Sequence, residues 1–128
     1  MDKYRNNHPD IAPTLGNYVR SIRAGDMLYI AGCTAANTEA EDGDVISQAK
    51  VTLERIKAIV EAEGGTTADV VKMVIYVTNM EGFRPRMGEF DGLVEQYFLG
   101  QYPTSTLVAT PGLARASLNI EIEATAVF

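Results

Sequence analysis

The residues of this chain that could do chemistry are carboxylates, hydroxyls, tyrosines and arginines, because there is one histidine and one cysteine. His8 lies near the N-terminus and Cys33 lies a quarter of the way along the chain. A triad built on histidine is therefore not expected, and neither is a zinc site, which normally takes several His or Cys ligands. No glycine-rich phosphate loop follows a strand-like segment. We accordingly expect no metal and no cofactor.

Two polar segments near the C-terminus stand out. In residues 118–128 the apolar side chains alternate with polar ones, so Glu121 and Glu123 share one face of an expected strand. Upstream, Thr104, Ser105 and Thr106 form a run of hydroxyls in which successive side chains point to opposite faces. Ser105 is a weak candidate for a covalent nucleophile, because no histidine, and no lysine identifiable from the sequence, is placed to activate it.

Periodicity predicts which elements position these groups. A turn at Ala24-Gly25-Asp26 joins two strands into a hairpin, and Gly64-Gly65 ends the first helix. Asp44 is placed to cap that helix. In chain order the expected elements are strands at 18–23 and 27–32, a helix at 45–63, a strand at 71–77, a helix at 87–98, and strands at 104–108 and 118–128.

The order β-β-α-β-α-β-β predicts a two-layer α+β domain, in which both helices cover one face of a single sheet. We expect this domain to span residues 15–128, after a flexible N-terminal arm at residues 1–14. The other sheet face would carry mixed residues, including Tyr18, Glu121 and Glu123. A sheet with an uncovered face usually packs against a partner.

Composition excludes several classes of protein. A length of 128 residues suits one domain, and the net charge of −6 argues against a nucleic-acid partner, since phosphate binding needs a cationic surface. No apolar run approaches the roughly 20 residues that span a bilayer, and the N-terminus has no apolar signal-peptide core. A lone cysteine fits a reducing compartment. We therefore expect a cytoplasmic protein with no membrane partner.

The C-terminal quarter resembles a known family. The segments are Tyr102-Pro103-Thr104-Ser105-Thr106-Leu107-Val108 and Ile120-Glu121-Ile122-Glu123-Ala124. They are similar to the Pro-x-Arg-Ser-(Thr/Cys)-Val and Ile-Glu-Ile-Glu-Ala motifs of the reactive intermediate deaminase family (RidA, YjgF or L-PSP). The resemblance extends from Leu15 to Val127. It also includes Gly16-Asn17-Tyr18, Tyr29-Ile30-Ala31-Gly32, a first helix around 48–59 and a strand at 70–77.

This resemblance implies a chorismate-mutase-like fold and a homotrimer whose sheets pack around a central barrel, with clefts between subunits. It implies a cofactor-free deaminase or hydrolase that acts on a small imine, enamine or related C–N compound. Glu121 would activate a water, Tyr18 would supply a hydroxyl and a ring wall, and Gly32 would offer backbone groups at close approach. The same register places the substrate-binding positions at Ser105, Thr106 and Leu107.

The sequence departs from the family pattern at residues that matter. Ser105 replaces the arginine that holds the substrate carboxylate, Leu107 stands where Thr or Cys is usual, and Ala31 replaces a common serine. The connection at 83–89 is about one helical turn longer. A serine cannot form the two parallel hydrogen bonds of a guanidinium. Its presence at this position therefore favours a substrate that is smaller, neutral or differently charged.

Other residues are candidates for completing the pocket. The missing positive charge would come from Arg84 or Arg86 in the longer connection, or from Arg115 in the loop at 111–116. The alternative for each of these arginines is a solvent-exposed loop residue with no role in the pocket. Cys33 directly follows Gly32 and would border the pocket or pack as a small buried hydrophobe.

Two alternatives to a deaminase remain open. A protein that binds a small metabolite without catalysis would keep the fold and explain the missing arginine. A ribonuclease or translation inhibitor is a label carried by some relatives, but the negative charge and the absence of a catalytic histidine argue against it.

Overall fold

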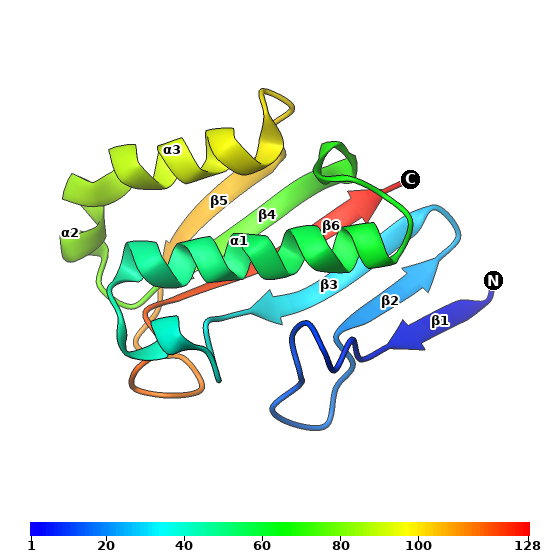
Figure 1. The fold of residues 1–128 in the computed structure, drawn as a ribbon, viewed down its shortest axis with the longest axis horizontal. Coiled ribbons are helices and arrows are strands. Elements are labelled where there is room, and N and C mark those ends of the chain that lie inside the picture. The colour runs from blue at the N-terminus through cyan, green and yellow to red at the C-terminus, as the bar shows by residue number, and fades with distance from the viewer.

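Helically spaced and alternating apolar residues meet in one core, between a single sheet and two helices. The computed structural model describes residues 1–128 and is shown in Figure 1. The strands are β1 (Lys3–Asn6), β2 (Ser21–Ala24), β3 (Met27–Cys33), β4 (Val70–Val77), β5 (Thr104–Ala109) and β6 (Ile120–Val127). The helices are α1 (Val45–Ala62), α2 (Met80–Phe83) and α3 (Met87–Phe98), with short 3₁₀ helices η1 (Glu39–Asp42), η2 (Thr67–Asp69) and η3 (Arg84–Arg86). The predicted α+β class is confirmed.

The six strands form one sheet in the order β1-β2-β3-β6-β4-β5. All neighbouring pairs are antiparallel except β4 and β5, which run parallel. A parallel pair needs a long crossover connection, and α2, η3 and α3 supply it. The closing strand β6 lies in the middle of the sheet, between β3 and β4. Both edges of β6 are therefore paired with a neighbouring strand.

Helices α1 and α3 lie on the same face of the sheet (Figure 1). Asp44 caps α1, because its side chain accepts a 2.8 Å hydrogen bond from the backbone N–H of Ser47. The core between the layers includes Leu53 and Ile56 from α1, Phe90 from α3, and Ile122 from β6, all buried. The alternation along β6 puts Ile120, Ile122, Ala124 and Ala126 on this buried face.

The opposite face of the sheet is uncovered in the single chain. Tyr29 of β3 is 50% exposed there, and Thr125 of β6 lies directly beside it. Glu121 pairs with Tyr76, and Glu123 pairs with Val74, so both acidic side chains belong to this open face. None of the helices is both long enough and apolar enough to cross a membrane.

The N-terminal segment differs from the flexible arm that the sequence suggested. Residues 3–6 form β1, paired with β2, and Ala12 packs into the core. His8 is buried, with Nε2 lying 3.0 Å from Ser21 Oγ and 3.0 Å from Glu63 Oε1. The strand shows no apolar alternation because all its residues are exposed, so no pattern in the sequence marked it.

The connection between β4 and α3 is also more ordered than a loop. It forms α2 and η3, and the side chain of Asn79 caps α2 by accepting a hydrogen bond from Gly82 N. Phe83 is buried and contacts Phe90 edge to face, with ring centroids 5.4 Å apart. This connection is therefore fixed to the core by an aromatic pair.

Candidate functional site

A cavity of about 190 Å³ lies where the C-terminal end of β3 meets the start of β6. It combines residues from five parts of the chain: the segment before β2, the end of β3 with the residues after it, the middle of α1, the loop after β5 and the start of β6. The lining residues are Pro13, Leu15, Tyr18, Arg20, Gly32, Thr34, Ala36, Arg55, Ala114 and Glu121. The cavity thus holds one carboxylate, two guanidinium groups and one tyrosine.

A bulge in β3 gives the cavity its shape. Ile30 pairs with Ala124 and Cys33 pairs with Ile122, so Ala31 and Gly32 together oppose a single residue of β6. A bulge of this kind bends the strand and adds one residue to it. Because of the extra residue, Ile30 and Cys33 both point toward the core, although three positions separate them. The extra residue brings the backbone of Gly32 against the side chain of Glu121.

The contact between Gly32 and Glu121 leaves no room for a side chain at position 32 unless the carboxylate of Glu121 moves. A β-carbon placed there would lie 2.5 Å from Glu121 Oε2 and 2.7 Å from its Cδ. Glycine permits this position of Glu121 because it has no β-carbon, and its backbone torsion does not call for glycine, since Gly32 is not among the residues with positive φ. The carboxylate of Glu121 consequently lies directly over exposed main chain.

Arg20 holds the bulge in place. Its guanidinium donates 2.7 Å hydrogen bonds to the carbonyl oxygens of Gly32 and Ala12, and a 3.1 Å bond to that of Pro13. The side chain is only 4% exposed and pairs with no carboxylate within the salt-bridge distance. Arg20 therefore ties the N-terminal segment to the end of β3 and fixes the wall opposite Glu121.

The pKa of Glu121 is raised above its ordinary value. Partial burial is the main cause, the nearby Glu123 carboxylate adds to it, and Arg20 opposes both. Tyr76 donates a 2.7 Å hydrogen bond to Glu123 Oε1, which keeps that second carboxylate in place beside Glu121. A carboxylate with a raised pKa, in contact with a cavity, is suited to accept a proton from water.

Tyr18 forms the lip of the cavity. Its ring is 44% exposed, its hydroxyl accepts a 3.2 Å hydrogen bond from Leu15 N, and the Arg20 guanidinium lies 5.6 Å from the ring centroid. The structure thus brings together three of the residues that the sequence singled out, Tyr18, Gly32 and Glu121.

The structure does not bring Ser105, Thr106 and Leu107 to this cavity. They lie on the edge strand β5, which β4 separates from β6. Two strand spacings are about 10 Å, and Ser105 shares a face with the buried Met73 and with Leu107, opposite to the face of Glu121. Thr106 pairs with Val74, as Glu123 does, so it lies on the open face, but it is two strands away from Glu121.

The other candidate arginines are occupied or remote. Arg86 donates 2.9 Å and 2.7 Å hydrogen bonds to Asp44 and Glu89. Arg115 is held by Glu41 at 2.8 Å and Asn37 at 3.0 Å, and Arg84 is exposed and lines no cavity with Glu121. None of the three lines the cavity around Glu121, so none supplies the missing charge within this chain.

Cys33 is a buried packing residue and not a reactive thiol. Burial raises the pKa of its thiol to about 11, despite the nearby Arg20 and Arg55. The thiolate is the reactive form, so a thiol with this pKa is inert at neutral pH.

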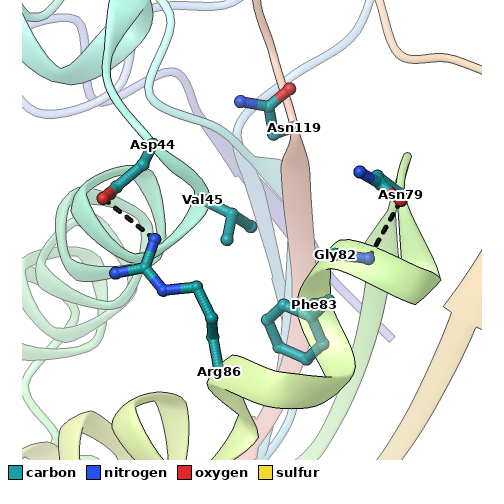
Figure 2. Close-up of a pocket in the computed structure, with 7 residues that line it drawn as sticks. All are labelled: Asp44, Val45, Asn79, Gly82, Phe83, Arg86 and Asn119. Carbon is teal, nitrogen blue, oxygen red and sulfur yellow. Dashed lines mark hydrogen bonds and ion pairs between the residues drawn. The ribbon is translucent and has the colours of Figure 1, made fainter.

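A second cavity, of about 260 Å³, lies at the N-terminus of α1. Figure 2 shows the Arg86 side chain reaching from η3 to Asp44, with Phe83, Val45 and Asn119 around the hollow. The polar groups of Arg86, Asp44 and Asn79 are engaged with one another or with Glu89, Ser47 and Gly82. An ion pair between Arg86 and Asp44 closes this cavity, and Arg86 is the only predicted site residue that lines it.

The sequence reasoning missed two residues, Arg20 and Arg55. Arg55 donates a 2.7 Å hydrogen bond to the carbonyl oxygen of Thr34 and a 2.9 Å bond to that of Ala36, both of which line the cavity. A signal was present: Arg55 follows Thr52 by three residues and precedes Ile59 by four, and both are buried. A cation on the buried stripe of a helix needs acceptors, and these carbonyls are the acceptors.

No group of three or more His, Cys, Asp or Glu side chains is gathered in a way that could hold a metal ion.

Comparison with known proteins places the whole chain in one family. The sequence profile of the Endoribonuclease L-PSP family matches residues 10–128. A RutC family protein of Pasteurella multocida is 32% identical over 123 residues, which cover 94% of this chain and 95% of that protein. TdcF of Escherichia coli K12, assigned provisionally as a reactive intermediate deaminase, is 31% identical over 118 residues, 88% of each chain.

Solved structures agree. RidA from an Antarctic Psychrobacter superposes with a TM-score of 0.84 at 26% identity, covering 98% of this chain and 100% of that one. A Thermotoga maritima protein assigned provisionally as an endoribonuclease superposes with a TM-score of 0.83 at 32% identity, covering 98% of both chains. The overall fold is thus shared with these solved structures, and the chain is a member of the RidA/YjgF/L-PSP family.

Proposed function

We propose that this protein is a cofactor-free hydrolase that deaminates a small imine or enamine, with Glu121 as the group that activates water. Family membership supports a reactive intermediate deaminase or L-PSP endoribonuclease-like function at the coarse level. The contact of Glu121 with Gly32 carries the finer proposal. It places a carboxylate of raised pKa over bare main chain at the wall of a small cavity.

The chemistry follows from that arrangement. The imine reacts as its protonated iminium: Glu121 takes a proton from a water as the water oxygen bonds to the imine carbon, and the electrons of the C=N bond move to nitrogen, which becomes a neutral amine. Glu121 then returns its proton to the nitrogen of the resulting aminoalcohol. The C–N bond breaks, ammonia leaves and a carbonyl forms as the hydroxyl gives its proton to the Glu121 carboxylate, which passes it to the ammonia. The hydroxyl of Tyr18, at the lip, would orient the polar end of the substrate.

We further propose that three copies assemble through the open face of the sheet. That face presents Tyr29 and other half-exposed side chains with nothing to cover them in one chain. A trimer would let the edge strand β5 of a neighbouring copy close the hollow in front of Glu121. Ser105, Thr106 and Leu107 would then contribute to the substrate pocket from across the interface. The setting we propose is the cytoplasm, where the single free cysteine, Cys33, stays reduced.

The test is hydrolysis of imines generated in situ from amino acids by an amino-acid oxidase, followed by the loss of imine absorbance and the release of ammonia. Carboxylate-bearing imines are compared with neutral ones, for wild type and for Ser105→Arg. A gain on carboxylates in the variant would mean that position 105 faces the cleft of a neighbouring subunit and tunes specificity. Absence of any turnover by either protein would reject the hydrolase.

One observation favours a second function, the binding of a metabolite without turnover. Ser105 offers one hydroxyl where deaminating relatives carry an arginine, and a hydrogen bond to a charged group is worth about 1.5–3 kcal/mol. A tight complex with a small metabolite, with no release of ammonia, would support this reading. Only the description of the family suggests a ribonuclease. The net charge of −6 opposes binding to RNA, so we expect no RNA cleavage.

A further inference from the structure

Two guanidinium groups line the cavity around Glu121, but only one of them is available to a ligand. All three nitrogens of the Arg20 guanidinium donate to backbone carbonyls, and the side chain is 4% exposed. Arg55 donates two hydrogen bonds, one from each terminal nitrogen. A guanidinium has five N–H donors, so most of the donors of Arg55 have no partner in the chain.

The head group of Arg55 lies at the cavity. The carbonyl groups that it binds belong to Thr34 and Ala36, and both residues line the same hollow as Glu121. These two bonds also fix the guanidinium against rotation, so its remaining donors are held in one orientation. A donor held in place in this way loses little conformational entropy when it binds a ligand.

Arg55 is a cation without a counter-ion. It forms no salt bridge with any carboxylate, and burial holds its pKa below the usual range, with Arg20 adding to the effect. Charged residues that leave water are normally paired. An anion bound next to Arg55 would provide the missing partner.

The charge balance of the cavity points the same way. With Glu121 ionised, the lining carries two positive groups and one negative group, in a chain whose net charge is −6. A locally positive pocket on a negative protein attracts anions of a size that fits, and a cavity of about 190 Å³ admits only a small one.

We infer that Arg55 of helix α1 is the residue that binds the anionic group of the substrate, so that specificity for a small carboxylate comes from the same subunit as Glu121. This rests on the proposed function for the reaction itself, but it concerns ligand binding and is testable without turnover. The resemblance gives the binding of the substrate carboxylate to an arginine at position 105, where this chain has serine. The inference assigns that role to Arg55. Helix α1, and not the edge strand β5, would then supply the anion site.

The experiment compares wild type with Arg55→Gln and Arg55→Lys, with Lys50→Gln as the matched control. Lys50 is exposed on the same helix and lines no cavity with Glu121, so its loss removes one positive charge outside the site. The probes are pyruvate and its neutral amide, pyruvamide. Dissociation constants are measured by calorimetry, and the melting temperature of each variant is recorded.

We expect wild type to bind pyruvate more tightly than pyruvamide. Arg55→Gln should weaken pyruvate binding by about 10- to 100-fold, with pyruvamide binding changed less than about twofold. Arg55→Lys, which keeps the charge but loses the fork of donors, should fall between them. Lys50→Gln should match wild type. The selective loss separates a role in anion binding from a structural role, since a collapsed pocket would lose both probes equally.

The inference is overturned if wild type shows no preference for pyruvate, or if Arg55→Gln weakens both probes to the same extent. Its failure is distinct from failure of the hydrolase. Wild type that binds pyruvate through Arg55 but hydrolyses no imine would keep the anion site and reject the reaction. Wild type that hydrolyses neutral and carboxylate imines equally well, with Arg55→Gln unchanged, would keep the reaction and reject the anion site.

Discussion

The α-carbon of Gly32 lies against the carboxylate of Glu121, and a β-carbon at residue 32 would stand only 2.5 Å from Oε2. The contact depends on a bulge in β3 that Arg20 holds through the Gly32 carbonyl, at 2.7 Å. The main chain of Gly32 therefore limits where the Glu121 carboxylate can lie, and the buried guanidinium of Arg20 holds that main chain in place.

Gly32→Ala tests whether that position matters. The new methyl group would displace the end of a flexible side chain, so we expect a small change in melting temperature but a loss of kcat/KM of about 100-fold, as for a misplaced catalytic group. Gly92→Ala on helix α3 is the control, because a β-carbon there meets open space. The control should keep full activity and gain about 0.5–1 kcal/mol of stability. Full activity in Gly32→Ala would show that the contact has no role.

Glu121→Gln should be more stable than wild type at neutral pH. The folded-state pKa of Glu121 is raised, mainly by burial, so ionisation of this group costs stability. The wild type loses that stability as pH rises from the unfolded-state pKa, about 4.3, through the higher folded-state value, whereas glutamine does not titrate. Thermal unfolding at pH 7 and at pH 3.5 measures the difference, which should vanish at the lower pH. Glu81→Gln, exposed and free of hydrogen bonds, should show no such pattern. Equal melting temperatures at pH 7 would contradict the account.

Glu123→Gln should shift the pH profile of the reaction. Glu123 is the second cause of the raised pKa of Glu121, after burial, and glutamine keeps an acceptor for the Tyr76 hydroxyl. A general base works when ionised, so activity falls as pH drops through its pKa. Removing the neighbouring charge lowers that pKa, and the acidic limb of kcat/KM should move to lower pH. An unmoved limb would mean that another group controls the profile.

Asp44 stabilises the start of α1 through its cap and, less strongly, through Arg86. The pKa of Asp44 is lowered to about 2, first by the Ser47 N–H and then by the Arg86 side chain. Its contribution is therefore present above about pH 4 and is lost as pH falls toward 2. We expect Asp44→Ala to cost about 1 kcal/mol at pH 7. Asp44→Asn, which can still cap the helix but loses the ion pair, should cost less than half of that. Chemical denaturation gives both values, and equal losses would assign the effect to the ion pair instead.

The proposed trimer predicts a mass in solution of about three times 13.9 kDa. Tyr29→Glu puts a charge on the open face of the sheet and should give smaller species. Tyr4→Glu is the matched control: Tyr4 is 65% exposed on β1 and pairs with Arg23, whose side chain lies on the helix side. Size-exclusion chromatography with light scattering measures the molar mass of the wild type and of both variants. A wild-type monomer would contradict the assembly.

Much of the fold could be predicted, because its signals are local. The cap at Asp44, the glycines after α1 and the apolar alternation of β6 each mark their element in the sequence. Strand β1 could not be predicted in this way, since it is short, exposed and held by pairing with β2 and by the buried contacts of His8.

The site was predictable only in part, for a similar reason. Tyr18, Gly32 and Glu121 were recognised through motifs, and the structure brings them to one cavity. Arg20 and Arg55 carry no motif, and their importance depends on which carbonyls the fold places within reach. Arg84, Arg86 and Arg115 were suggested by charge alone, and acidic neighbours distant in sequence engage two of them, Asp44 for Arg86 and Glu41 for Arg115.

The most direct test of the central claim is the rate of imine hydrolysis by wild type and by Glu121→Gln, on imines generated in situ with and without a carboxylate. We predict that wild type accelerates ammonia release above the spontaneous rate and that Glu121→Gln loses about 100- to 10,000-fold of that acceleration. The variant should still bind pyruvate. Equal rates for the two proteins, or no acceleration by wild type, would contradict the assignment of Glu121 as the base.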